Sequence, residues 1–268
     1  MKKFLASIIA VVLAVSGLSV ISITANAATI FISGNYEYTV NSDDTVNIAG
    51  YKGIATDITI PSQILNKNVV KISANSFYNN STLTSVKIPN TIKVVGSMAF
   101  HNCTKLSKVT LPSNLTEIGY NAFEGTTALT TITIPKTVTT AGNNVFNGSA
   151  LKTAAIENGA TAVADNLFSN AKNLTKVTIP NTVKKVGSMS FYGCKSLSSV
   201  TLPNTLTEIG YSAFNGTTAL TTITIPKTVT KAGSDVFEDS GLKTATIENG
   251  ATAVADNLFS NAKNLTKV

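Results

Sequence analysis

The stretch Leu83–Cys103, LTSVKIPNTIKVVGSMAFHNC, contains the pattern from which most of this chain is built. It opens with Leu-x-x-Val-x-Ile-Pro, continues with Ile-x-x-Val-Gly and closes on Ala-Phe and a cysteine. The pattern starts again, at spacings of 22 or 23 residues, at Leu106, Leu129, Leu151, Leu174, Leu197, Leu220, Leu242 and Leu265. A fixed period of this length predicts a solenoid, in which each repeat packs only against its neighbours.

A second period of 91 residues lies above the first, because residues 86–177 nearly recur as residues 177–268. The two units differ almost only at positions that the pattern assigns to the outside. Residues 151–168 and 242–259 depart from the pattern in the same way, with Glu-Asn-Gly where the other repeats have proline. Asn-Gly is a turn signal and predicts a differently shaped corner. We therefore expect one elongated array and no separate globular domains.

The first part of each unit predicts a short parallel strand. Val86 and Ile88 alternate with Ser85 and Lys87, so one face of this strand is apolar and the other polar. Pro89 ends the strand because proline has no N–H to donate to a neighbouring strand. All seven prolines of the chain occupy this position, which sets the register.

The second part of each unit predicts a shorter extended segment at Ile92–Val95 and a tight corner at Gly96. Ser97–Asn102 then predicts a single helical or 3-10 turn that carries Phe100 inward. The equivalent aromatic positions predict a continuous buried column, consisting of Phe77, Phe100, Phe123, Phe146, Phe168, Phe191, Phe214, Phe237 and Phe259.

The N-terminus predicts export. Two lysines precede an apolar run over residues 4–20, and Ala25-Asn26-Ala27 then supplies the small-x-small pattern of a signal peptide. We expect residues 1–27 to be a signal peptide that is cleaved before Ala28. An uncleaved anchor helix is the alternative, since the run approaches the ~20 residues that span a bilayer.

Residues 28–57 predict a β-hairpin that caps the array. Tyr36–Val40 and Thr45–Ile48 are two alternating runs joined by the polar turn Asn41–Asp44. Two carboxylates in such a turn are fewer than calcium sites use, so no metal site is predicted. The repeats then occupy residues 58–268, and the last repeat is incomplete. Because the chain stops in the middle of a predicted strand, we expect the gene product to continue.

The two cysteines of the chain, Cys103 and Cys194, lie 91 residues apart at the same position of the repeat. Four repeats of parallel strands separate them by ~19 Å. This exceeds the ~7 Å between Cα atoms that a disulfide tolerates. We therefore expect two separate buried thiols and no catalytic cysteine.

The composition argues against two large classes of function. The formal net charge is +7, but only 13% of residues are charged, the lysines are scattered, and the sequence has no arginine or tryptophan. Nucleic-acid binders instead cluster basic residues and interleave them with aromatics. With one histidine, no nucleophile motif and no clustered carboxylates, we expect no catalytic residues, no cofactor and no enzyme activity.

The repeated unit resembles the BspA-like leucine-rich repeat of bacterial surface proteins, over roughly residues 55–268. The resemblance implies a mainly β, right-handed leucine-rich-repeat solenoid. It also implies a secreted or cell-surface protein that adheres to a protein or glycoprotein ligand on a host, a matrix or a neighbouring cell. Contact with a membrane is expected only through the signal peptide or an anchor outside the sequence.

The candidate binding surface consists of outward strand residues and two turn tyrosines. The residues are Ser85, Lys87, Lys108, Thr110, Thr131, Thr133, Lys176, Thr178, Tyr120 and Tyr211. Tyr78, His101 and Tyr192 are further exposed anchors on this interpretation. Two alternatives stay open: a structural spacer that displays another domain, and an ice-binding surface formed by rows of Thr-x-Thr.

Overall fold

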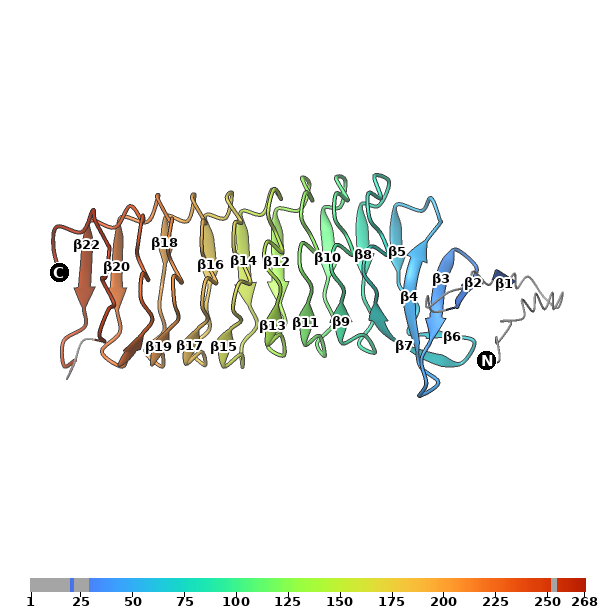
Figure 1. Cartoon of the computed structure of the whole chain (residues 1–268), viewed down its shortest axis with the longest axis horizontal. Coiled ribbons are helices and arrows are strands. Elements are labelled where there is room, and N and C mark those ends of the chain that lie inside the picture. Colours follow the sequence, from blue (N-terminus) through green and yellow to red (C-terminus); the bar gives the residue numbers. More distant parts are fainter. Residues whose placement is uncertain (1–19, 22–28, 252–254) are drawn as a thin grey trace, which may run out of the picture.

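The computed structural model describes residues 20–21, 29–251 and 255–268. The predicted signal peptide and its cleavage site lie almost entirely outside these residues. The described chain winds into an elongated β-solenoid of about nine turns, with the antiparallel strands at one end and the last repeats at the other (Figure 1). No helix among the described residues is long and apolar enough to cross a membrane.

The strands of the solenoid form two series, and each turn before the one that contains β22 contributes one described strand to each series (Figure 1). The first-strand series consists of β5 (Asp57–Thr59), β8 (Ser85–Lys87), β10 (Lys108–Thr110), β12 (Thr131–Ile134), β14 (Thr153–Ile156), β16 (Lys176–Thr178), β18 (Ser199–Val200), β20 (Thr222–Ile225) and β22 (Thr244–Ile247). The second-strand series consists of β7 (Lys67–Ile72), β9 (Val94–Val95), β11 (Glu117–Ile118), β13 (Thr140–Ala141), β15 (Ala162–Val163), β17 (Lys185–Val186), β19 (Glu208–Ile209) and β21 (Lys231–Ala232).

The strands of both series pair in parallel, and equivalent positions of successive repeats face each other. Val86 pairs with Val109 in the first series, and Val95 pairs with Ile118 in the second. The phase read from the prolines is therefore confirmed.

Neither series is a continuous sheet. Within the described residues the first-strand series divides into β5–β10, β12–β18 and β20–β22, with no ladder joining β10 to β12 or β18 to β20. These two gaps lie 91 residues apart. The second-strand series is interrupted once, between β13 and β15, where the irregular repeat begins.

The predicted aromatic column is confirmed. Successive rings from Phe77 to Phe259 stack with centroids 4.9–5.9 Å apart and interplanar angles of at most 23°. Every ring before Phe259 is at most 2% exposed. Buried leucine, isoleucine and valine side chains complete one continuous apolar core along the solenoid.

The expected helical or 3-10 turns are wrong: the described residues contain strands and turns only. In the turn after Gly96, Met98 and Asn102 have φ values of 55° and 54°, which interrupt any right-handed helix. The N–H groups of these residues bond to the next repeat, for example from Met98 N to Tyr120 O at 2.8 Å. Pairing between turns thus replaces pairing within a helix.

Side-chain hydroxyls add a second set of links between repeats. Thr116 Oγ1 donates to Lys93 O at 3.1 Å, and Thr207 Oγ1 donates to Lys184 O at the same distance, 91 residues later. Thr137 Oγ1 donates to Leu115 O at 2.6 Å. The abundance of threonine in this chain is therefore partly structural.

Antiparallel strands precede the array. β1 (Val20–Ile21) pairs with β2 (Ile30–Ser33), β2 with β3 (Tyr36–Val40), and β3 with β4 (Val46–Tyr51), while β6 (Gln63–Ile64) pairs with β7. β4 then runs parallel to β7, and the Tyr51 ring stacks on Phe77 with centroids 5.4 Å apart. The first ring of the column is covered in this way. That these strands act as a separate cap stays a prediction.

The two cysteines are free and buried, as expected. Cys103 Sγ donates to Phe77 O and Cys194 Sγ donates to Phe168 O, each at 3.1 Å. Each thiol thus satisfies the backbone carbonyl of a phenylalanine in an earlier repeat.

Candidate binding surface

The outward side chains of the first-strand series form one surface, here called the main face. Alternation along each strand produces it: in β12, Ile132 and Ile134 are buried while Thr131 and Thr133 are exposed. Since every repeat has the same phase, these outward positions line up along the solenoid.

Three hollows lie along the main face. The first has a volume of about 660 Å³ and extends over β10, β12, β14 and β16. The second, of about 390 Å³, lies over β18, β20 and β22, and the third, of about 270 Å³, lies over β5, β8 and β10. The main face is thus recessed along much of its length.

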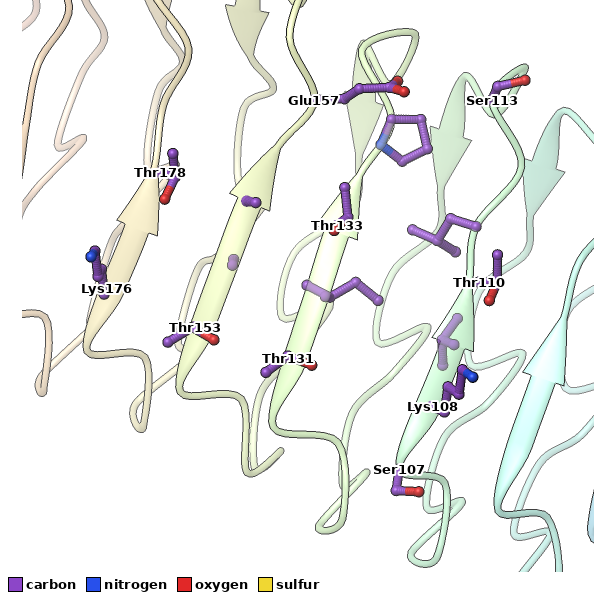
Figure 2. A pocket seen from close by; sticks show the side chains of 16 residues that line it. Ser107, Lys108, Thr110, Ser113, Thr131, Thr133, Thr153, Glu157, Lys176 and Thr178 are labelled. Atoms are coloured by element: carbon purple, nitrogen blue, oxygen red, sulfur yellow. The ribbon is translucent and has the colours of Figure 1, made fainter.

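The first hollow combines hydroxyls with two ammonium groups (Figure 2). Lys108 comes from β10 and Lys176 from β16, with the threonines of β12 and β14 between them. Glu157, which follows β14, lies at the rim, and its Oε2 accepts a hydrogen bond from Lys136 N at 3.0 Å. The cations are therefore spread across the hollow, while the carboxylate is held at one edge.

The floor of the first hollow is apolar where the sheet is interrupted. Val109 and Leu111, beside the gap between β10 and β12, are only partly buried. In contrast, Val86 and Ile132 at equivalent positions are 1% and 5% exposed. A partner that entered the hollow would cover these side chains and gain their burial.

The second hollow is the counterpart of the first, one 91-residue unit later. Its lining includes Thr201, Thr222 and Thr224, which correspond to Thr110, Thr131 and Thr133. The lysine of β10 has no counterpart, because Ser199 stands at the position of Lys108. The two hollows thus share equivalent threonines but differ in volume and in charge.

The structure brings eight of the ten candidate residues together on the main face. The first hollow is lined by Lys108, Thr110, Thr131, Thr133, Lys176 and Thr178, and the third hollow is lined by Ser85 and Lys87 together with Lys108 and Thr110. Ser85 is only partly exposed.

The turn tyrosines lie apart from this surface. Tyr120 follows β11 and Tyr211 follows β19, both in the second-strand series. Their side chains are 43% and 49% exposed, and neither lines any of the three hollows.

The interpretation of His101 and Tyr192 as exposed anchors is wrong, because both are partly buried. The His101 ring stacks on Tyr78 with centroids 4.9 Å apart, and its side chain is 16% exposed. Its Nδ1 lies 3.2 Å from Glu124 Oε2, so a protonated imidazole would form an ion pair there. Tyr78 itself is exposed, as expected.

Sequence reasoning missed the gaps and the hollows. The residues beside a gap, Lys108–Leu111, follow the same pattern as the fully paired Ser85–Ile88. Two signals were available: the irregularities recur every 91 residues, and leucine replaces the usual isoleucine at residues 111 and 202, in the repeats beside the gaps.

Burial disfavours the thiolate form of both cysteines. Burial raises the pKa of the Cys103 thiol to about 12 and raises the pKa of Cys194 as well. A nucleophilic cysteine needs the opposite shift, because the thiolate is the reactive form. Within the described residues, no three histidine, cysteine, aspartate or glutamate side chains gather into a group that could hold a metal ion.

Comparison with known proteins gives matches to a repeat family and to solved structures. The family model "BspA type Leucine rich repeat region" matches six copies over residues 54–175 and 161–268. A leucine-rich repeat protein from Bacteroides ovatus is similar at 26% identity over 88% of this chain and 70% of that one, with a TM-score of 0.56.

A second solved structure, the leucine-rich repeat protein of T. pallidum, is similar at 24% identity. The match covers 87% of this chain and 88% of that one, with a TM-score of 0.52, and supports the fold alone. None of the curated proteins matches the sequence.

Proposed function

Because the chain belongs to the BspA-type leucine-rich repeat family, whose fold is a scaffold for protein interaction, we propose that it is a non-catalytic adhesion protein. On this proposal the protein is exported or held at the cell surface. It binds a protein or glycoprotein of a host, a matrix or a neighbouring cell through the main face.

The first hollow carries this proposal. It is the largest of the three hollows, and it offers lysines, threonine hydroxyls and partly exposed apolar side chains together. Protein interfaces combine an apolar centre with a polar surround in this way. The recurring leucine and phenylalanine positions and the aliphatic positions between them are used by the core, so the variable outward positions are the ones free to contact a partner.

Export is supported by the sequence at the N-terminus. A short positive segment, an apolar run and Ala25-Asn26-Ala27 make up the pattern that signal peptidase reads. The measurement is the N-terminal sequence of the protein recovered from culture medium or the cell envelope. We expect it to begin at Ala28, whereas a chain that keeps Met1 inside the cell would contradict export.

Binding is tested with a panel of immobilised matrix proteins and host glycoproteins by biolayer interferometry. The face variant carries Lys108→Glu and Lys176→Glu, which reverse both cations of the first hollow. The control variant carries Lys93→Glu and Lys184→Glu, an equal change of charge at two exposed lysines that line none of the three hollows.

We expect the face variant to bind at least about tenfold more weakly, a loss of about 1.4 kcal/mol. The control should bind as the unchanged protein does. Equal losses in the two variants would place the contact elsewhere and contradict the role of the first hollow.

The spacer is the second candidate, and the near-identity of the two 91-residue units favours it, since a spacer needs length more than a site. No binding to any panel member above that of heat-denatured protein would favour the spacer over the adhesion protein. Ice binding gains no support. The rows of threonine line hollows and are interrupted at the gaps, whereas a flat surface is needed to match an ice lattice.

A further inference from the structure

We propose that Asn158–Gly159 is a site of spontaneous deamidation, which adds a negative charge at the rim of the first hollow. The chain contains four Asn-Gly pairs, at residues 147–148, 158–159, 215–216 and 249–250. Glycine after asparagine leaves the backbone amide unshielded, so each pair has the sequence that the reaction needs. The structure separates the four pairs into two groups.

Asn158 and Gly159 lie in the exposed turn after β14, and both are solvent-exposed. Gly159 has a φ of 93°, and its N–H donates to Asn158 Oδ1 at 3.0 Å. The nitrogen that must attack is therefore already beside the side-chain carbonyl that it attacks, which favours ring closure. The same N–H also donates to Thr182 Oγ1 at 3.2 Å, an oxygen that can pass the departing proton to water.

The reaction needs only water. Gly159 N forms a bond to Asn158 Cγ and gives up its proton, the bond from Cγ to Nδ2 breaks, and ammonia leaves. The resulting succinimide then takes up one water molecule at either of its two carbonyls. The products are aspartate and isoaspartate, and the net change is water gained and ammonia lost.

In two of the other pairs, a hydrogen bond to a carboxylate restrains the asparagine side chain and should slow deamidation. Asn147 Nδ2 donates to Glu124 Oε1 at 2.8 Å, and Asn215 Nδ2 donates to Glu238 Oε2 at 2.7 Å. Hydrogen bonds to a carboxylate are among the stronger ones, so each amide must first break such a bond before it can rotate toward the next glycine. The fourth pair, Asn249–Gly250, is exposed in the turn that corresponds to Asn158–Gly159, and Gly250 has a φ of 85°.

The new carboxylate would stand beside Glu157, which already lines the first hollow. One event lowers the formal net charge of +7 by one and places two negative charges next to each other at the rim. Isoaspartate also adds a backbone CH₂ to the turn. The surface of the hollow thus changes with the age of the molecule.

The test is peptide mapping by mass spectrometry of the purified protein after incubation at 37 °C and mildly alkaline pH. Deamidation appears as a mass increase of about 1 Da in the affected peptide. We expect it at Asn158 at least about tenfold faster than at Asn147, a difference of about 1.4 kcal/mol between the two barriers. The variant Asn158→Gln, which would need a larger ring, should show no such change at this position.

Two further measurements test the structural reason. In urea the contacts that hold Asn147 are lost, so its rate should rise to within a few-fold of that of Asn158. The variant Glu124→Ala should raise the rate at Asn147 in the folded protein. Equal rates at Asn147 and Asn158 in the folded chain would overturn the proposal, and so would a rate at Asn147 that neither urea nor Glu124→Ala increases.

Discussion

Replacing Phe146 by alanine should be among the most damaging single changes in this protein. The Phe146 ring is 0% exposed and lies between Phe123 and Phe168, with centroid distances of 5.7 and 5.9 Å. Truncation removes the transfer free energy of the ring and leaves a cavity that the neighbouring rings cannot fill without leaving their own repeats. Substitutions of this kind cost about 3–5 kcal/mol.

The assay is thermal unfolding followed by circular dichroism, with urea unfolding as a second measure. For a chain of this size, a loss of 3–5 kcal/mol lowers the melting midpoint by roughly 6–20 °C. Since each repeat contacts only its neighbours, the transition should also become broader as the array divides at the damaged repeat.

Tyr120→Ala is the matched control, because it also removes an aromatic ring from a turn but from an exposed position. A surface change should shift stability by about 0.5 kcal/mol or less. Phe146→Leu should lie between the two, since leucine refills part of the volume. Equal losses for Phe146→Ala and Tyr120→Ala would refute the assignment of inside and outside positions on which the fold description rests.

Three other outcomes follow from the structure. Neither Cys103 nor Cys194 should react with a thiol reagent in the folded protein, and both should react in urea, as measured by absorbance of the released chromophore; rapid modification of the folded chain would contradict their burial. Burial raises the pKa of Cys103 from 9.0 to about 12, so the neutral thiol stabilises the fold below pH 9 and this contribution is lost as the pH rises toward 12. Urea midpoints across that range should therefore fall more steeply for the unchanged protein than for Cys103→Ala, and parallel curves would argue against the shift. Gly96→Ala should cost about 1–3 kcal/mol, because its Cβ would stand 2.7 Å from Ala74 N; a melting midpoint equal to that of the unchanged protein would show that the corner can open.

Much of the fold was predictable because the repeat fixes which side chains point inward. The alternation of Val86 and Ile88 with polar residues, and the proline that ends each strand, gave the register correctly. The recurrence of phenylalanine at one position of every repeat predicted the stacked aromatic column correctly. The form of the turns was not predictable in this way, because the left-handed φ values occur at Met98 and Met189 as well as at asparagines. Asparagine adopts these values readily, but methionine does not. At Met98 and Met189 the conformation is accompanied by a hydrogen bond from the backbone N–H to a carbonyl of the next repeat.

The sequence predicted which side chains of the candidate surface point outward, but not that they line a hollow. Outward residues such as Lys108 and Thr131 follow from alternation alone, and they do line a hollow. The hollow itself lies where β10 and β12 fail to pair. Leucine replaces the usual isoleucine at residues 111 and 202, in the repeats beside the two gaps, but the repeat pattern alone does not tell that pairing stops there. The partial burial of His101 was also not predictable from its own repeat, because its side chain contacts Tyr78 and Glu124 in neighbouring repeats.

The equal pairing of the two units has a consequence for how such a protein can change length. β8 pairs with β10 through Val86 and Val109, and β16 pairs with β18 through Val177 and Val200, at the same motif positions. A duplicated block of 91 residues would therefore meet, on both of its ends, surfaces that already fit each other. Genetic duplication or deletion of whole blocks thus requires no new interface to evolve, and the reach of the molecule can vary among lineages while its packing stays the same.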